Sequence, residues 1–138
     1  MKYFEHESAA TFDEAVSLLK ESPKGKTVVM AGGSDLIGVL KEQILEDYPE
    51  KVVDLKTVRG GEYIKQDGDT IEIGALTKLC DIVKSDLLNE KAPVLSQAAR
   101  SVATPLIRNV ATMGATYARM CAAGFTAIPT HRPAGWTV

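Results

Sequence analysis

The sequence contains little cysteine, few aromatic residues and no excess of charge of one sign. Cys80 and Cys121 are its only cysteines in 138 residues, and they form no C-x-x-C pair. A disulfide scaffold or a structural zinc site is therefore not expected, and unpaired thiols fit a reducing cytoplasm. Lys and Arg number 16 against 18 Asp and Glu. This balance argues against a nucleic-acid partner and against a polybasic membrane-surface module, because both need a basic excess.

Long apolar runs are also missing. No run approaches the roughly 18 to 20 residues that a spanning helix needs. The N-terminal segment is interrupted by Glu5, Glu7, Asp13 and Glu14, so it has no signal-peptide core. Hydrophobic residues make up 45% of the chain and charged residues 25%, which are ordinary globular values. We expect a soluble, cytoplasmic protein with no membrane partner.

The first part of the chain predicts a small α/β lobe with parallel strands. Thr11 and Glu14 have the spacing of a capping box, which opens a helix that ends near Ser22. A short β-branched run, 27–31, predicts a buried strand, a helix follows over 36–43, and a second strand covers 52–55. The order strand, glycine turn, helix, strand is typical of parallel pairing.

The pattern changes after Lys56. Two runs, Glu62–Gln66 and Thr70–Gly74, predict a hairpin about Asp67-Gly68. Thr77 is placed to cap the helix that follows, and Pro93 to start a helix that runs to about Ala103. The fold class is therefore α+β: a parallel βαβ lobe followed by a partial antiparallel sheet with helices.

The segment from Ala115 onward differs in kind. Asp and Glu are absent after Glu90, and prolines and glycines punctuate the end. Alanine and threonine follow neither a helical nor a strand period, so composition predicts irregular or partly disordered chain.

The segment Met30–Leu36, MAGGSDL, carries the clearest chemical signal. Gly32 and Gly33 allow a sharp turn and a close approach of ligand to backbone. The N–H groups from Ser34 to Leu36 lie at a helix start, where they suit a phosphate or pyrophosphate. The alternative is a simple helix N-cap at Ser34 or Asp35, and the negative charge of Asp35 disfavours an anion. The loop is neither a Walker A motif nor G-x-G-x-x-G.

Two later segments join this loop in an ordered set: 73–77, IGALT, and 101–114, SVATPLIRNVATMG. With AGGSDL they resemble the FAD-binding subunit or domain of the molybdopterin-dependent dehydrogenases, the group of xanthine dehydrogenase and carbon monoxide dehydrogenase. That family shows AGGTDLL, then IGAxT, then VAS-P-QIRNxATIGGN. The N-terminal F-x-EA-x-x-LL stretch and the VVDL strand also match, so the resemblance covers residues 1 to about 114. A generic nucleotide-binding domain would leave the last motif without a role.

The resemblance implies FAD as cofactor and assigns its contacts by position. The loop that cradles the pyrophosphate maps to Ala31, Gly32, Gly33, Ser34, Asp35 and Leu36, and the remaining cofactor contacts map to Thr77, Thr112 and Gly114. Arg108 leads into the last turn, with a surface or strand-pairing role as the alternative, and Met113 fits packing. Thr77 has helix capping alone as its alternative. No catalytic residue and no metal ligand is expected, because the redox chemistry belongs to the cofactor.

The resemblance stops at Gly114, where Ala115 stands in place of the continuing family motif. We expect lobes at 1–56 and 57–114 and a divergent tail at 115–138. One restored nucleotide after the Gly114 codon, with suitable codons, turns the tail into the family-like GNLCQDVRCWFYRYPH. We therefore hypothesise an out-of-frame tail, with natural divergence as the alternative, and gene sequencing across this codon distinguishes them.

The function expected from the resemblance is FAD-binding electron transfer within a molybdenum-dependent oxidoreductase, here truncated. Its partners would be a molybdenum-cofactor subunit and an iron–sulfur subunit. The alternative is a non-catalytic folded fragment that retains no FAD and self-associates through exposed sheet edges.

Overall fold

The computed structural model describes residues 1–23, 25–43, 45 and 47–122. The chain divides into two compact units, Met1–Gly60 and Gly61–Val138. Within the described residues, no helix is both long enough and apolar enough to cross a membrane.

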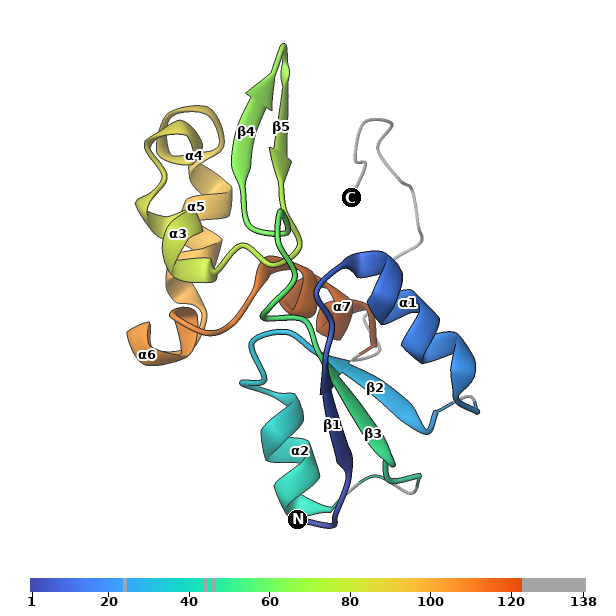
Figure 1. Ribbon diagram of the computed structural model, residues 1–138. Coiled ribbons are helices and arrows are strands. Elements are labelled where there is room, and N and C mark those ends of the chain that lie inside the picture. The colour runs from blue at the N-terminus through green and yellow to red at the C-terminus, as the bar shows by residue number, and fades with distance from the viewer. Residues whose placement is uncertain (24, 44, 46, 123–138) are drawn as a thin grey trace. The chain divides into compact units, whose positions relative to one another are not determined.

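The first unit contains a three-stranded parallel sheet with strand order β1-β3-β2 (Figure 1). Its strands are β1 (Glu5–Ser8), β2 (Thr27–Met30) and β3 (Lys51–Asp54). The predicted parallel pairing of β2 with β3 is confirmed, with Val28 opposite Val52. Strand β1 was not predicted, because its four residues are all polar.

An ion-pair cluster explains how a polar segment forms a strand. Lys51 on β3 contacts Glu7 at 2.8 Å and Glu5 at 3.5 Å, both on the neighbouring β1. The hydrogen bond to Glu7 raises the pKa of Lys51 above its ordinary value. Cross-strand pairs of opposite charge therefore replace apolar alternation at this edge of the sheet.

Helix α1 (Phe12–Glu21) begins with the predicted capping box. The Glu14 N–H donates to Thr11 Oγ1 at 3.1 Å, and the Ala10 N–H donates to the Glu14 carboxylate at 2.7 Å. The helix ends at Ser22, also as predicted. Its apolar stripe is less buried than the pattern indicates, since Ala15 is buried while Phe12 and Val16 are exposed.

Helix α2 (Leu36–Glu42) connects β2 to β3 and supplies the core of the first unit. Leu40 packs with Met30 and Val52, which lie on the same face of the sheet. The Tyr48 hydroxyl donates to the Leu40 carbonyl at 3.2 Å. The predicted strand–turn–helix–strand order is confirmed, and it fixes the bend between β2 and α2.

The second unit begins with the hairpin β4 (Ile64–Asp67) and β5 (Thr70–Ile73). The strands pair antiparallel, with Asp67 opposite Thr70. The predicted hairpin is confirmed, but its turn is Gly68-Asp69 rather than Asp67-Gly68. Gly68 has φ +57°, a conformation that glycine adopts without strain.

The helices of the second unit among the described residues are α3 (Leu79–Lys84), α4 (Asp86–Lys91), α5 (Pro93–Ser101), α6 (Pro105–Arg108) and α7 (Met113–Ala122). Their buried core is Leu79, Ile82, Leu88, Ala99 and Ala111. Pro93 starts α5 as predicted, and the helix ends two residues before the predicted Ala103. The short helices α4 and α6 were not predicted.

Helix α7 corrects the prediction of irregular chain from Ala115 onward. The helix continues to Ala122, so the prediction is wrong for 115–122. The Thr116 N–H and hydroxyl both donate to the Thr112 carbonyl, which helps to carry the chain into the helix. The rest of the predicted tail, 123–138, lies outside the described residues.

Candidate functional site

The bend 31–36 leaves β2 at its carboxyl end and enters α2. Gly33 has φ +76°, and a Cβ there would lie 3.0 Å from Ile37 Cδ1 and 3.1 Å from Met30 Sδ. The left-handed φ therefore favours glycine at 33, and a Cβ there would also require the ends of the Ile37 and Met30 side chains to shift. The carboxyl ends of parallel strands are the usual place for ligands in open α/β sheets.

Four backbone N–H groups of this bend have no hydrogen-bond partner among the described residues. Within the described residues, the N–H groups of Gly32, Gly33, Ser34 and Leu36 donate no hydrogen bond. The Gly33 carbonyl instead accepts from Ile37 N–H at 3.1 Å, at the start of the helix. Ser34 is exposed, and Gly32, Gly33 and Leu36 are half-buried. Unpaired backbone N–H groups beside a left-handed glycine are donors of the kind that bind anions.

The alternative prediction, a helix N-cap at Ser34 or Asp35, is confirmed in position. The residue at the N-cap position of α2 is Asp35, with φ −101° and ψ −52°. Its side chain makes no capping hydrogen bond to the helix. The bend is consequently not explained as a side-chain cap of α2.

Thr77 lies in the second unit and is 2% exposed. Its hydroxyl accepts from the Tyr63 N–H at 3.0 Å and donates to the Tyr63 carbonyl at 2.9 Å. The prediction that Thr77 caps α3 is wrong, because Lys78 occupies the N-cap position. Through these two hydrogen bonds with the Tyr63 backbone, Thr77 instead stabilises the segment that precedes β4.

In the turn 111–114, unlike the bend 31–36, backbone N–H groups already donate hydrogen bonds to other parts of the second unit. We call this turn closed. Met113 N–H donates to the Thr77 carbonyl at 2.9 Å, and Gly114 N–H donates to the Ala75 carbonyl at 2.8 Å. A Cβ on Gly114 would lie 2.9 Å from that same Ala75 oxygen. Gly114 therefore permits close backbone packing, and its N–H is already used.

Thr112 is the exception in this turn. It is 5% exposed, and its Oγ1 has no hydrogen-bond partner within the described residues. A buried hydroxyl without a partner costs about 1–3 kcal/mol, so its presence calls for an explanation.

Arg108 holds the turn before α6. Its guanidinium donates to the carbonyl of Val102 at 2.7 Å and to that of Ala103 at 3.0 Å. Ala103 has φ +43°, which is unfavourable for alanine. Arg108 thus has a structural role other than the strand-pairing alternative, and Thr104 caps α6 by accepting from Ile107 N–H at 3.4 Å.

Sequence reasoning passed over Asp54, a buried carboxylate at the carboxyl end of β3, opposite Met30. Asp54 Oδ1 accepts from Lys56 N–H at 3.0 Å, and Oδ2 lies 3.5 Å from His6 Nε2. The sequence could have predicted this buried carboxylate, because Asp54 directly follows the apolar residues of a predicted buried strand. These contacts assign Asp54 to the turn after β3, at the same edge of the sheet as the bend.

The described residues offer no cluster of three or more His, Cys, Asp or Glu side chains able to hold a metal ion. Burial and the neighbouring Asp81 raise the pKa of the Cys80 thiol. This thiol is therefore protonated near neutral pH and is a poor nucleophile.

Comparison with known proteins identifies the family of this chain. Residues 2–117 match the family model of the FAD binding domain in molybdopterin dehydrogenase. The nicotinate dehydrogenase FAD-subunit of Eubacterium barkeri is 32% identical over 90% of this chain and 41% of its own length. The carbon monoxide dehydrogenase medium chain of Hydrogenophaga pseudoflava is 31% identical over 80% of this chain and 38% of its own.

Solved structures give the same result. A carbon monoxide dehydrogenase from Hydrogenophaga pseudoflava that lacks the Mo-pyranopterin moiety matches with a TM-score of 0.80 and 30% identity, covering 85% of this chain and 40% of that one. The chain thus spans about two-fifths of the length of these relatives. Because the family model matches most of the sequence, the chain belongs to the family of FAD-binding domains of molybdopterin dehydrogenases.

Proposed function

We propose that the chain binds FAD and that the bend 31–36 holds the pyrophosphate. The observation that carries the proposal is the set of open N–H groups at Gly32, Gly33, Ser34 and Leu36. Backbone N–H groups at a bend of this kind bind phosphate oxygens, and glycine lets them approach without Cβ obstruction. The Ser34 hydroxyl is exposed and adds one donor. The residues present therefore fit the cofactor's two phosphates.

For the second unit we propose a single direct FAD contact, the Thr112 hydroxyl. Its Oγ1 lacks a partner in the described protein, whereas the hydroxyl of Thr77 and the N–H of Gly114 are already engaged. Thr77 and Gly114 would then position backbone rather than touch the cofactor.

The role that follows is electron transfer within a molybdenum-dependent oxidoreductase. FAD, when bound, supplies the redox chemistry, and the residues of this chain bind and orient it. Companion chains would carry the molybdenum cofactor and iron–sulfur clusters. No acid, base or nucleophile of this chain is assigned to the reaction.

The experiment is a titration of the full chain with FAD, followed by flavin fluorescence and isothermal calorimetry. Gly33→Val should weaken binding about tenfold or more, because a β-branched residue is strained at φ +76° and is expected to shift the bend, while its Cβ presses on Ile37 and Met30. Gly38→Ala is the matched control. It lies in α2 with open space around a built Cβ, so it should leave FAD affinity unchanged and add up to about 1 kcal/mol of stability. Equal FAD affinity of Gly33→Val and the unmodified chain would contradict the site.

A second candidate function is a folded fragment that retains no FAD. The closed turn 111–114 favours it, since the Met113 and Gly114 N–H groups are not available to a ligand. Affinity requires extensive burial of a ligand, and one open bend supplies only part of it. Absence of bound flavin, together with no calorimetric response to added FAD, would decide for this alternative.

A further inference from the structure

Asp54 is a carboxylate at the end of β3, beside the bend 31–36, and its side chain is 12% exposed. In the parallel register Asp54 lies opposite Met30, the last residue of β2 before the bend. The Leu55 N–H donates to the Met30 carbonyl at 2.8 Å, so β2 and β3 stay hydrogen-bonded up to the bend. Because neighbouring strands lie about 4.8 Å apart, Asp54 is one strand spacing away from the residue that leads into the bend.

The side chain of Asp54 lies on the face of the sheet that the bend approaches. Residues directly opposite each other on neighbouring strands share a face, so Asp54 shares one with Met30. The Met30 side chain in turn meets the bend, since its Sδ lies 3.1 Å from the position of a Cβ built on Gly33. Asp54 and Gly33 are therefore both neighbours of Met30, the first across the strand pair and the second through the Met30 side chain.

The turn after β3 uses one oxygen of the Asp54 carboxylate more fully than the other. Oδ1 accepts from the Lys56 N–H at 3.0 Å. Among the described residues, Oδ2 has longer contacts, 3.5 Å to His6 Nε2 and 3.5 Å to Lys56 Nζ, and both of these side chains are about half exposed. A carboxylate offers about four acceptor positions, so Oδ2 has room to accept further hydrogen bonds from a ligand that carries hydroxyl groups.

The order of these parts along the chain is that of a dinucleotide site. A glycine bend follows one strand, a helix leads to the neighbouring parallel strand, and an acidic residue ends that strand, 21 residues after Gly33. In doubly wound folds, an Asp or Glu about 20 residues beyond the phosphate-binding glycines binds a ribose hydroxyl of the nucleotide. The bend 31–36 lacks the G-x-G-x-x-G motif of those folds, so the correspondence lies in the topology and in the position of Asp54.

We propose that Asp54 binds the adenosine ribose of FAD, with Oδ2 accepting a hydrogen bond from the 2′- or the 3′-hydroxyl. This inference rests on the proposed function, because it places the ribose beside a pyrophosphate held by the bend 31–36. A hydroxyl that donates to a carboxylate forms a charge-assisted hydrogen bond, roughly twice as strong as a neutral one. The negative charge of Asp54 repels phosphate and attracts hydroxyl donors, so it also sets the direction of the cofactor, with the adenosine toward β3.

The first test changes the ligand and leaves the chain unmodified. FAD and two analogues, one without the 2′-hydroxyl and one without the 3′-hydroxyl of the adenosine ribose, are titrated into the full chain by isothermal calorimetry. At least one analogue should bind about tenfold less tightly than FAD, because Asp54 Oδ2 loses its donor. Equal affinity of the chain for all three ligands would overturn the ribose contact and leave the pyrophosphate site in place.

The variant Asp54→Asn tests whether that loss comes from the carboxylate. Asparagine keeps the size of the side chain and an acceptor for the Lys56 N–H, and it removes the charge. The variant should bind FAD about fivefold less tightly, and its preference for FAD over the weaker analogue should shrink from about tenfold to about twofold. If Asp54 only stabilises the turn after β3, Asp54→Asn weakens the binding of all three ligands by one common factor, and that result would overturn the proposal.

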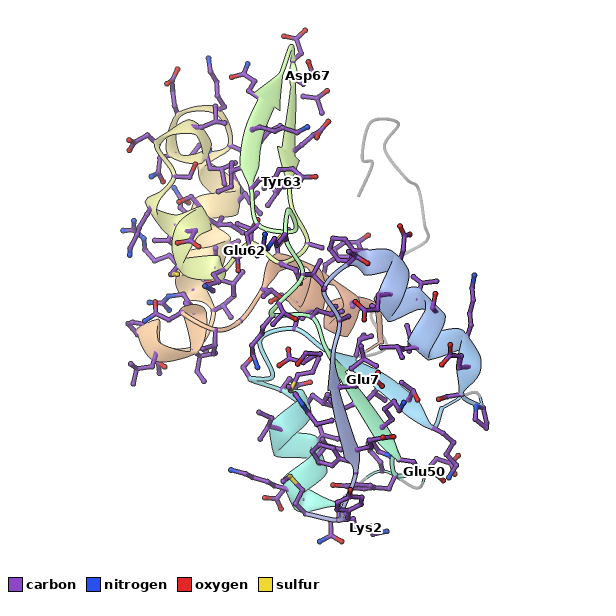
Figure 2. All side chains as sticks on the ribbon, in the orientation of Figure 1. Lys2, Glu7, Glu50, Glu62, Tyr63 and Asp67 are labelled. Atoms are coloured by element: carbon purple, nitrogen blue, oxygen red, sulfur yellow. The ribbon has the colours of Figure 1, made fainter. Side chains whose placement is uncertain are left out.

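Glu50→Gln is the matched control for the loss of one negative charge. Glu50 precedes β3 at the amino end of the sheet (Figure 2), and its carboxylate forms an exposed ion pair with Lys26. This variant should bind all three ligands as the unmodified chain does, and a loss equal to that of Asp54→Asn would contradict a specific contact. A chain that binds none of the ligands would refute the proposed function and this inference together. FAD binding that Gly33→Val weakens, without any preference for FAD over the analogues, would refute the ribose contact alone.

Discussion

Two glycines, Gly33 and Gly114, lie where a helix begins, and the backbone N–H groups around them differ. In the first unit, Gly33 takes a left-handed conformation and the neighbouring N–H groups stay open. In the second unit, Gly114 presses against Ala75, and its N–H is consumed by the Ala75 carbonyl. Glycine thus permits a bend with unpaired N–H groups in the first unit, and close packing of one backbone segment against another in the second.

The two turns also differ in the hydrophobic core beside them and in how closely backbone segments pack there. The bend of the first unit lies at a sheet edge beside a small core of Met30, Leu40 and Val52. The turn of the second unit borders a larger core, and Gly74 is so close to the Gly61 carbonyl that a Cβ would collide with it. The comparison indicates that the second unit depends on close backbone packing and the first does not.

The largest expected effect comes from Gly74→Ala. Its Cβ would collide with the Gly61 carbonyl oxygen, which is backbone and has no rotamer to change. We expect about 3 kcal/mol of destabilisation, confined to the second unit. Hydrogen exchange measured at Ile82 should accelerate, while exchange at Leu40 in the first unit serves as internal control. An unchanged hydrogen-exchange rate at Ile82 would contradict the conclusion that the second unit depends on close backbone packing.

A smaller effect is expected from Thr77→Val, which keeps the shape of the side chain and removes the hydroxyl. The Tyr63 N–H and carbonyl lose their partner, so the free energy of unfolding should fall by about 2 kcal/mol. Thr77→Ser keeps the hydroxyl and should lose less, about 1 kcal/mol for the buried methyl. Urea unfolding compares the two variants. If Thr77→Ser and Thr77→Val lower the free energy of unfolding equally, the Thr77 hydroxyl does not stabilise the segment before β4.

The smallest effect, and one of opposite sign, is expected from Thr112→Val. Removing a buried hydroxyl that has no partner should stabilise the FAD-free chain by about 1 kcal/mol. The same variant should bind FAD less tightly if Thr112 contacts the cofactor. Thermal unfolding with and without FAD measures both changes. Destabilisation of the FAD-free chain would mean that the hydroxyl is satisfied.

Local patterns predicted much of the secondary structure. The capping box at Thr11, the strand before Ala31 and the proline start of α5 depend on neighbours a few residues away, and all three are confirmed. Helix α7 was missed because Ala115 to Ala122 has no clear apolar period, although the turn before it is anchored by contacts with Ala75 and Thr77. The polar strand β1 was missed because Lys51, which joins Glu5 and Glu7, lies far along the chain.

The family, the order of most elements and the position of the glycine bend can be read from the sequence alone, because motif spacing and hydrophobic period are visible along the chain. Which backbone donors remain available depends on how the folded chain brings distant segments together. The partners of Met113, Gly114 and Tyr63 are supplied by residues 14 to 39 positions away, at Thr77 and Ala75. A hydrogen bond between distant segments exists only once the chain has brought them together, so no local pattern distinguishes the open bend from the closed turn.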